Sequence, residues 1–383
     1  MALHFDRSEY DARMTAAIRE MTRRRSDGLL LFQQESMYWL TGYDTFGFCF
    51  FQCLFLGADG RMALLTRSAD LRQAQRTSII DDIRIWTDAA DAQPATQLRD
   101  MLESLGARGR RLGIEANAYG LNHQLGKQVD AALDGVCRLS DASGLIDALR
   151  AVKSPAELTY VRRAGILADA ALAAGLEQVH PGADEGTILA AIQGTIFLGG
   201  GDYPGNEFVI GSGDDAILCR YKSGRRTLSD DDQLTLEFAG VYRHYHAALM
   251  RTVVIGQPRP QHQRMSDACE EALEACEAVL RPGHTAGEVF AAHARVMDAH
   301  GMAAHRLNAC GYSLGAKFTP SWMDQPMFYR DNPFALRPDM VFFAHMVLMD
   351  SETDTAMTLG RTYILTDGPP EPLSAVPLAL IRR

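Results

Sequence analysis

Hydrophobic and polar positions in the first 150 residues alternate between strand-like and helix-like segments. Short apolar runs bounded by turn residues predict buried strands, whereas apolar positions repeating every three to four residues predict amphipathic helices. Strands mixed with helices at this spacing predict an α/β domain. The predicted strands are 28–32, 48–56 and 61–65, and the predicted helices are 95–105 and 120–133.

A helix start marks the end of this first domain. The sequence Lys153-Ser-Pro-Ala-Glu157 places a serine that can cap a helix three residues before a glutamate, which is the pattern of a capping box. A long helix is predicted to follow, over residues 155–179. We therefore predict two domains, residues 1–152 and residues 153–383.

The second domain contains a faint internal repeat. Two Pro-Gly pairs, at 181–182 and 282–283, each follow one predicted helix and precede another, which Asp184 or Thr285 can cap. We predict two related halves around one central site. The alternative is chance, because Pro-Gly pairs commonly follow helices. Strand-like runs complete each half: 208–210 and 234–238 in the first, and 340–345 and 362–366 in the second.

Composition and charge narrow the class of protein. The 383 residues are 47% hydrophobic and 22% charged, which is typical of a folded chain with sizeable cores and excludes collagen-like or disordered classes. A net charge of -10 argues against a nucleic-acid or anionic-membrane partner. Two short basic runs, 23–25 and 108–111, are interpreted as solvated surface. No apolar run is long enough to predict a membrane span.

Cysteine usage and the N-terminal sequence predict the compartment. The seven cysteines are scattered and form no CxxC pair, which favours a reducing environment over disulfides or a zinc site. Residues 1–10 contain no apolar segment of the kind found in secretory signals. We therefore expect a cytoplasmic protein.

Several motifs resemble the creatinase/prolidase superfamily. They are Met37-Tyr-Trp-Leu-Thr-Gly42, the junction at 153–157, Arg251-Thr252, and the segments 311–315 and 336–342. The resemblance implies a creatinase-like N-terminal α/β domain followed by a C-terminal pita-bread domain (α+β) with an internal pseudo-duplication. It also implies a homodimer that acts on a small-molecule substrate.

The same resemblance implies that the metal centre of the superfamily is not retained. Its peptidases hold two divalent ions with two Asp, one His and two Glu. At those places this sequence has Glu237, Ala248, Tyr312, His345 and Gly360. Alanine and glycine have no ligand atom, and tyrosine is a poor ligand for the usual ions. We therefore expect no metal and no other cofactor. A site for a single metal ion, formed by Glu237, His246 and His345, remains an alternative.

The chain is more similar to the metal-free branch, the creatinases and ectoine hydrolases. The segment 237–246, the segment 311–315 with Trp322 after it, and the segment 39–44 resemble those of ectoine hydrolases. A histidine that the branch carries after the first strand is replaced here by Arg220. The resemblance implies a metal-independent hydrolase of a C–N bond of amide, amidine or urea type, in a small polar or zwitterionic molecule.

Three residues are predicted to be catalytic. Glu237 lies in an apolar run, so we expect it to be buried, which raises the pKa of a carboxyl group, and to serve as general base, nucleophile or cation anchor. The alternative is a purely structural role for Glu237, in an ion pair with Arg243 or Arg220 inside the sheet. His246 and His345 are candidate proton carriers, because imidazole titrates near neutral pH. The alternative for His345 is a structural role, as a core histidine whose ring nitrogens are hydrogen-bonded within the protein.

Four further residues are predicted to bind substrate. Arg220 could bind a substrate carboxylate, Tyr312 could donate to a developing oxyanion, and Trp322 could cover a small cation or ring. Arg67 matches an N-domain arginine that in some relatives reaches the partner subunit's site. Each of these residues has a structural role as its alternative.

Other functions remain open from the sequence. Changed catalytic residues on a shared fold are compatible with a lyase. Loss of the metal ligands is compatible with a non-catalytic binding protein derived from a peptidase. A metal-dependent Xaa-Pro dipeptidase is what the overall resemblance suggests, but the replaced ligands argue against it.

Overall fold

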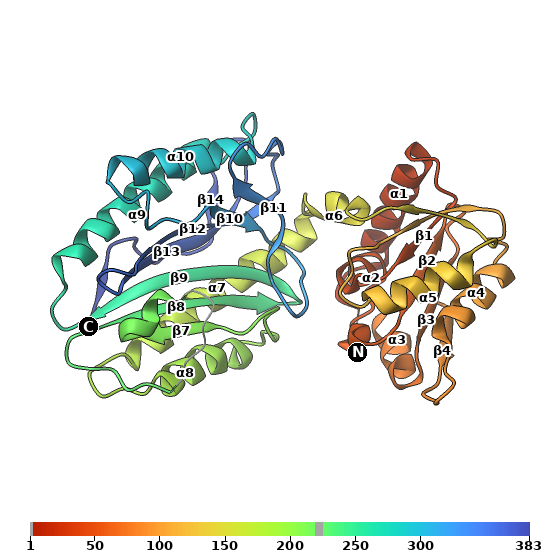
Figure 1. Cartoon of the computed structure of the whole chain (residues 1–383), viewed down its shortest axis with the longest axis horizontal. Helices are drawn as coiled ribbons and strands as arrows, with labels where there is room; N and C mark the ends of the chain where they lie inside the picture. The colour runs from red at the N-terminus through yellow and green to blue at the C-terminus, as the bar shows by residue number, and fades with distance from the viewer. Residues whose placement is uncertain (1–2, 219–224) are drawn as a thin grey trace. The chain divides into compact units, whose positions relative to one another are not determined.

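The computed structural model describes residues 3–218 and 225–383. The chain folds into two compact units, Met1–Arg150 and Ala151–Arg383, which we name the N-terminal unit and the C-terminal unit. Figure 1 shows them from red to yellow and from yellow to blue along the chain. Among the described residues, no helix combines the length and the apolar composition needed to cross a bilayer.

The N-terminal unit is built on a six-stranded sheet in the order β4-β3-β2-β1-β5-β6. Successive side chains of a strand point to opposite faces, so its apolar strands bury side chains on both sides. Leu30 and Phe55 pack with α4 and α5 on one face, and Leu29 and Leu31 pack with α1 and α2 on the other. The strands are β1 Gly28–Leu31, β2 Cys53–Gly57, β3 Met62–Arg67, β4 Asp82–Trp86, β5 Arg111–Ile114 and β6 Arg138–Asp141. The helices are α1 Arg7–Arg23, α2 Gln34–Thr41, α3 Leu71–Thr77, α4 Pro94–Ser104, α5 His123–Leu133 and α6 Leu145–Arg150.

The predicted α/β character of this unit is confirmed, with one boundary wrong. The run expected to form a strand over 48–56 begins instead with a single 3₁₀ turn, Gly47–Cys49, and the strand starts only at Cys53. Apolar composition alone does not distinguish a strand from a buried irregular segment, which explains the error.

The C-terminal unit contains one large sheet with two matching halves. Its main path is β11-β10-β12-β13-β9-β8-β7, so β9 and β13 pair at the centre and each half extends outward from them. Helices α7 and α8 accompany the first half, and α9 and α10 the second (Figure 1). The helices are α7 Pro155–Glu177, α8 Glu185–Leu198, α9 Pro260–Val279 and α10 Ala286–Ala299. The strands are β7 Val209–Ser212, β8 Asp232–Tyr242, β9 Tyr245–Ile255, β10 Ala309–Ser313, β11 Asp324–Tyr329, β12 Val341–Asp350, β13 Thr355–Ile364, β14 Glu371–Pro372 and β15 Ile381–Arg382.

Local capping signals set the helix starts as predicted. Ser154 accepts a hydrogen bond from the backbone of Glu157, whose carboxylate binds the Ser154 backbone in return, so the capping box before α7 is confirmed. Asp184 caps α8, and Thr285 forms a second capping box before α10. These short-range contacts begin the helices that support the two halves of the sheet.

A close approach of α7 to β8 makes Gly240 a sensitive position. A Cβ atom at Gly240 would lie 2.0 Å from the Ala164 carbonyl oxygen and 2.5 Å from the Ala168 nitrogen, both backbone atoms. We expect Gly240→Ala to lower the free energy of unfolding by about 3 kcal/mol, because the helix must move away from the sheet. Urea unfolding measures the change. Gly194→Ala on α8, where a Cβ meets nothing within 4 Å, is the control and should not destabilise.

Candidate functional site

The strand register places the predicted metal-ligand positions on one face of the large sheet. Glu237 pairs with Met250, Met250 with Gly360, and Gly360 with His345. Directly paired residues of neighbouring strands share a face, so these four form a row across the sheet. Ala248 lies two residues from Met250 on the same face. Tyr312 pairs with Phe343, two residues from His345, and therefore joins them.

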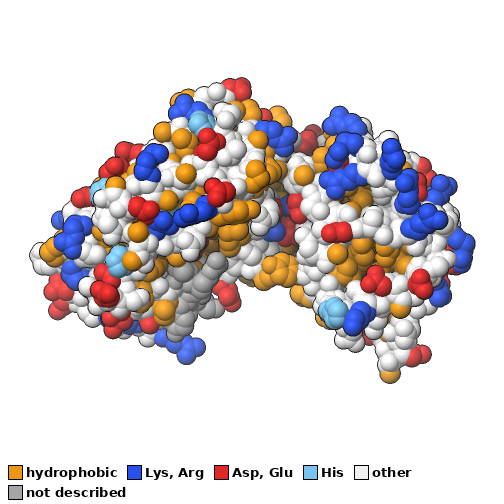
Figure 2. Space-filling view, turned by 45° about the horizontal axis from the view of Figure 1, so that its top comes forward, with side chains coloured by type: hydrophobic (Ala, Val, Ile, Leu, Met, Phe, Trp, Pro, Cys, Tyr) orange, Lys and Arg blue, Asp and Glu red, His pale blue; other side chains and the backbone are white. Residues whose placement is uncertain are grey.

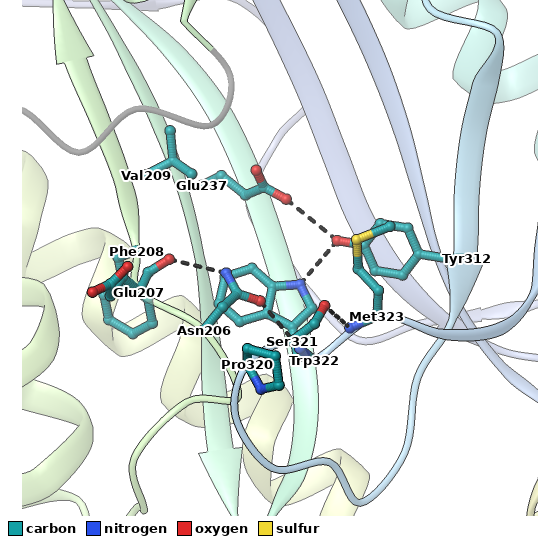
Figure 3. Close-up of a pocket in the computed structure, with 10 residues that line it drawn as sticks. All are labelled: Asn206, Glu207, Phe208, Val209, Glu237, Tyr312, Pro320, Ser321, Trp322 and Met323. Atoms are coloured by element: carbon teal, nitrogen blue, oxygen red, sulfur yellow. Dashed lines mark hydrogen bonds between the residues drawn. The ribbon is translucent and has the colours of Figure 1, made fainter. Parts of the chain in front are cut away.

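A cavity of about 220 Å³ opens over this face. Figure 3 shows Glu237 from β8 and Tyr312 from β10 converging above the indole ring of Trp322. Both aromatic side chains are buried. The lining residues are Asn206, Glu207, Phe208, Val209, Glu237, Tyr312, Pro320, Ser321, Trp322 and Met323.

A chain of hydrogen bonds connects three of the predicted site residues. The Trp322 indole Nε1 donates to the Tyr312 hydroxyl at 2.9 Å, and the Tyr312 hydroxyl donates to Glu237 Oε1 at 3.3 Å (Figure 3). The Trp322 backbone nitrogen in turn donates to Asn206 Oδ1 at 3.1 Å. The carboxylate is therefore oriented by a phenol whose own position is set by a buried indole.

The expectation that Glu237 is buried was wrong. Its neighbours Leu236 and Phe238 are fully buried, but Glu237 itself is only half-buried because its side chain faces the cavity. Arg243, one suggested ion-pair partner, lies in the two-residue turn after β8, and Arg220, the other, lies outside the described residues. The Glu237 side chain therefore forms part of the cavity wall.

A second, smaller cavity of about 100 Å³ adjoins the first. Glu237, Tyr312 and Met323 line both, and His345 lines the second together with Met250. The His345 ring is buried and lies 5.6 Å from the Tyr312 ring, centroid to centroid. The structure thus places Glu237 and His345 on one cavity, three strand spacings or about 14 Å apart along the sheet, so they do not form a directly hydrogen-bonded acid-base pair.

His246 is placed differently from the other candidates. Its Nε2 accepts a hydrogen bond from the Gly205 backbone at 2.9 Å, and its Nδ1 lies 3.4 Å from the Gly315 carbonyl oxygen, which fits a neutral ring with the proton on Nδ1. Complete burial lowers its pKa to about 3. His246 pairs with Val241, four residues or about 13 Å along β8 from Glu237. It packs behind Trp322, at 6.2 Å between ring centroids, and lines neither cavity.

Two predicted substrate-binding arginines, Arg220 and Arg67, are not among the described residues that line these cavities. Arg220 lies outside the described residues. Arg67 ends β3 of the N-terminal unit, where it forms an ion pair with Asp88 at 2.9 Å and its guanidinium lies 4.1 Å from the centre of the Phe50 ring. Its role toward a partner subunit stays a prediction.

Several lining residues were missed from the sequence. Asn206, Glu207 and Phe208 come directly before β7, and Val209 of β7 pairs with Glu237. The available signal was the predicted strand 208–210 in the same half as the strand that carries Glu237, because residues before a neighbouring strand can reach the same cavity. Ser321 and Met323 flank Trp322 in sequence and line the cavity with it.

Comparison with known proteins assigns the chain to a family. Residues 159–367 match metallopeptidase family M24, and residues 13–152 match the creatinase/prolidase N-terminal domain. The chain belongs to metallopeptidase family M24. The predicted two-domain α/β pita-bread fold is thereby confirmed, in agreement with the structure.

Curated M24 relatives include enzymes and uncharacterized proteins. Ectoine hydrolase of Halomonas elongata is 28% identical over 99% of this chain and 98% of its own length. An uncharacterized hydrolase/peptidase of Sinorhizobium fredii is 27% identical over 99% of this chain and 98% of its own. A prolidase from Thermococcus sibiricus has the same fold, with a TM-score of 0.88 at 19% identity over 98% of this chain and 99% of that one. The sequence relatives support hydrolase activity, and the prolidase shows the fold alone.

The residues present do not fit the metal pair that the M24 family name implies. Ala248 and Gly360 have no ligand atom, and the Tyr312 hydroxyl already joins Trp322 to Glu237. Within residues 3–218 and 225–383, no group of three or more His, Cys, Asp or Glu side chains could hold a metal ion.

Proposed function

We propose that this M24 protein hydrolyses a C–N bond of amide, amidine or urea type in a small polar or zwitterionic molecule, without the metal pair of the peptidases. The observation that carries the proposal is the hydrogen-bonded chain from Trp322 through Tyr312 to Glu237. It places an oriented carboxylate in a cavity where family peptidases have metal ligands. Ectoine hydrolase, as a relative over nearly the full length, supports a non-peptide substrate.

Glu237 is proposed as the general base. It takes a proton from a water molecule, the water oxygen bonds to the carbon of the C–N bond, and the nitrogen leaves after receiving a proton. His345 lines the adjoining cavity and is the proposed second proton carrier. The Tyr312 hydroxyl holds the Glu237 carboxylate in one orientation, which reduces the ordering needed at the moment of reaction.

The cavity lining supports a small substrate with a positively charged part. The Glu237 carboxylate faces the cavity, which the aromatic residues Phe208 and Trp322 also line. Carboxylates and aromatic faces both attract cations. A volume of about 220 Å³ is below the size of typical drug-binding pockets, which favours a molecule of few atoms.

Proton NMR of the purified protein with a panel of small amides, amidines and ureas, including ectoine and creatine, tests the proposal. We expect turnover of at least one member with a chelator present, because the proposed base needs no metal. Inertness toward the whole panel, with activity on an Xaa-Pro dipeptide only after metal loading, would contradict it and support a dipeptidase. Inertness under both conditions would contradict it in favour of a binding protein or a lyase.

The oligomeric state and the cellular compartment of the protein are also proposed. We propose a cytoplasmic homodimer, with no nucleic-acid or membrane partner, in which Arg67 contributes to the partner subunit's site. Light scattering of the purified chain measures the oligomeric state directly. A monomer at micromolar concentration would contradict the dimer and with it the role of Arg67.

A further inference from the structure

The two basic runs that the sequence suggests as separate solvated surfaces lie side by side in the N-terminal unit. The first run follows α1, and the second leads into β5. Hydrogen bonds join the segments: the Asp27 backbone nitrogen donates to the Arg111 carbonyl oxygen at 2.7 Å, and the Ser26 hydroxyl lies 3.4 Å from the same oxygen. Arg24, Arg25 and Arg111 consequently line one cavity of about 370 Å³, together with Arg138 of β6.

The strand register defines the floor of this cavity. Leu29 pairs with Gly113, and Gly113 pairs with Ser140, so these three residues share one face of the sheet. Arg111 pairs with Arg138 on the same face, in neighbouring parallel strands about 4.8 Å apart. The floor is thus apolar around Leu29 and carries two adjacent cations at its edge.

Most of the positive charge around the cavity is not neutralised. Arg24 forms an ion pair with Glu20 at 2.7 Å. The guanidinium groups of Arg25, Arg111 and Arg138 form no ion pair or hydrogen bond with any described residue. The carboxylate of Asp141, the acidic residue in the lining, accepts from the Ser143 backbone at 2.8 Å.

This concentration of positive charge contrasts with the whole chain, which has a net charge of -10. Figure 2 shows Lys and Arg side chains gathered along the upper and right-hand border of the N-terminal unit. Like charges on adjacent strands repel each other, and a bound anion removes that repulsion. The arrangement of Arg111 beside Arg138 is therefore suited to an anionic ligand.

We propose that this cavity is a binding site for a small organic phosphate. Guanidinium groups bind phosphate oxygens through paired N–H donors, and exposed arginines from the segment after α1, from β5 and from β6 line the cavity. Leu29, Ala142 and Leu145 are among the apolar residues that line the cavity, and the remainder of the ligand would lie against them. A volume of about 370 Å³ falls within the usual range of small-molecule sites. The site lies within the N-terminal unit and is distinct from the cavity at Glu237.

Calorimetric titration with phenyl phosphate tests this proposal, with inorganic phosphate and benzoate as comparison ligands. We expect phenyl phosphate to bind at least tenfold more tightly than either, because it offers both the dianion and the apolar ring. The double variant Arg111→Gln, Arg138→Gln should weaken phenyl phosphate binding at least tenfold. Arg76→Gln is the matched control, since Arg76 is exposed on α3 and does not line the cavity.

Three outcomes would overturn the proposal. One is a phenyl phosphate affinity unchanged in the double variant, and another is equal weakening in the Arg76→Gln control, which would indicate general electrostatics. The third is binding of a single-stranded oligonucleotide that the double variant abolishes, without binding of phenyl phosphate. That result would make the patch a nucleic-acid surface. None of these outcomes bears on the hydrolase activity proposed for the C-terminal unit.

Discussion

Glu237→Gln is expected to reduce turnover by about 10³-fold or more, because the amide cannot accept a proton from water. The substitution keeps the size of the side chain and an oxygen that can accept the Tyr312 hydroxyl, so the cavity should retain its shape. Substrate binding should change less than turnover. Steady-state kinetics on whichever panel member is hydrolysed, with chelator present, separates kcat from KM.

Glu274→Gln is the matched control for this experiment, because Glu274 is an exposed carboxylate on α9 outside both cavities. It should leave kcat and KM unchanged. Retention of more than a tenth of wild-type kcat in Glu237→Gln would exclude this carboxylate as the base. His345 would then be the remaining proton carrier in the adjoining cavity.

The C-terminal unit is expected to lose stability steeply below pH 6.5. Burial is the main cause of three depressed pKa values: that of His246 is lowered to about 3, and those of His262 and His293 to about 4. Above pH 6.5 these histidines are neutral in both states and contribute no pH dependence. Below it the unfolded chain binds protons that the folded chain cannot, so the free energy of unfolding falls until pH approaches 4. Each histidine accounts for about 2 kcal/mol at pH 5.

Urea unfolding at pH 7.5 and pH 5.0 measures this loss. Trp322 fluorescence reports on the C-terminal unit if Trp39 and Trp86, both in the N-terminal unit, are replaced by Phe. His262→Asn should shrink the difference between the two pH values by about 2 kcal/mol. His180→Asn, an exposed position after α7, should leave it unchanged. Equal stability at both pH values would contradict the assignment of these histidines as neutral in the folded chain.

Several helix starts could be predicted from the sequence because capping depends on short-range information. The capping box at Ser154 and Glu157 involves residues three positions apart and forms as expected. The resemblance assigned Glu237, Tyr312 and His345 to the metal-ligand places of the family, and the register shows that the three share one face of the sheet. Alternation along a strand turns a sequence position directly into a face.

The environment of those residues could not be predicted, because it depends on which distant segments pack against them. Glu237 lies in an apolar run yet faces a cavity, since the segments around Asn206 and Trp322 leave open space above it. His246 has the imidazole side chain of a proton carrier, but the Gly205 backbone nitrogen and the Gly315 carbonyl oxygen contact its two ring nitrogens.

The sequence by itself determined the two-domain α/β architecture and the capped starts of α7, α8 and α10, which follow from local patterns. Only the tertiary structure decided which candidates share a cavity and which are enclosed in the core. It also brought Arg111 and Arg138 beside Arg25 to form a concentrated cationic site. The physical reason is that burial and charge concentration are properties of the packed chain, set by contacts between residues far apart in sequence.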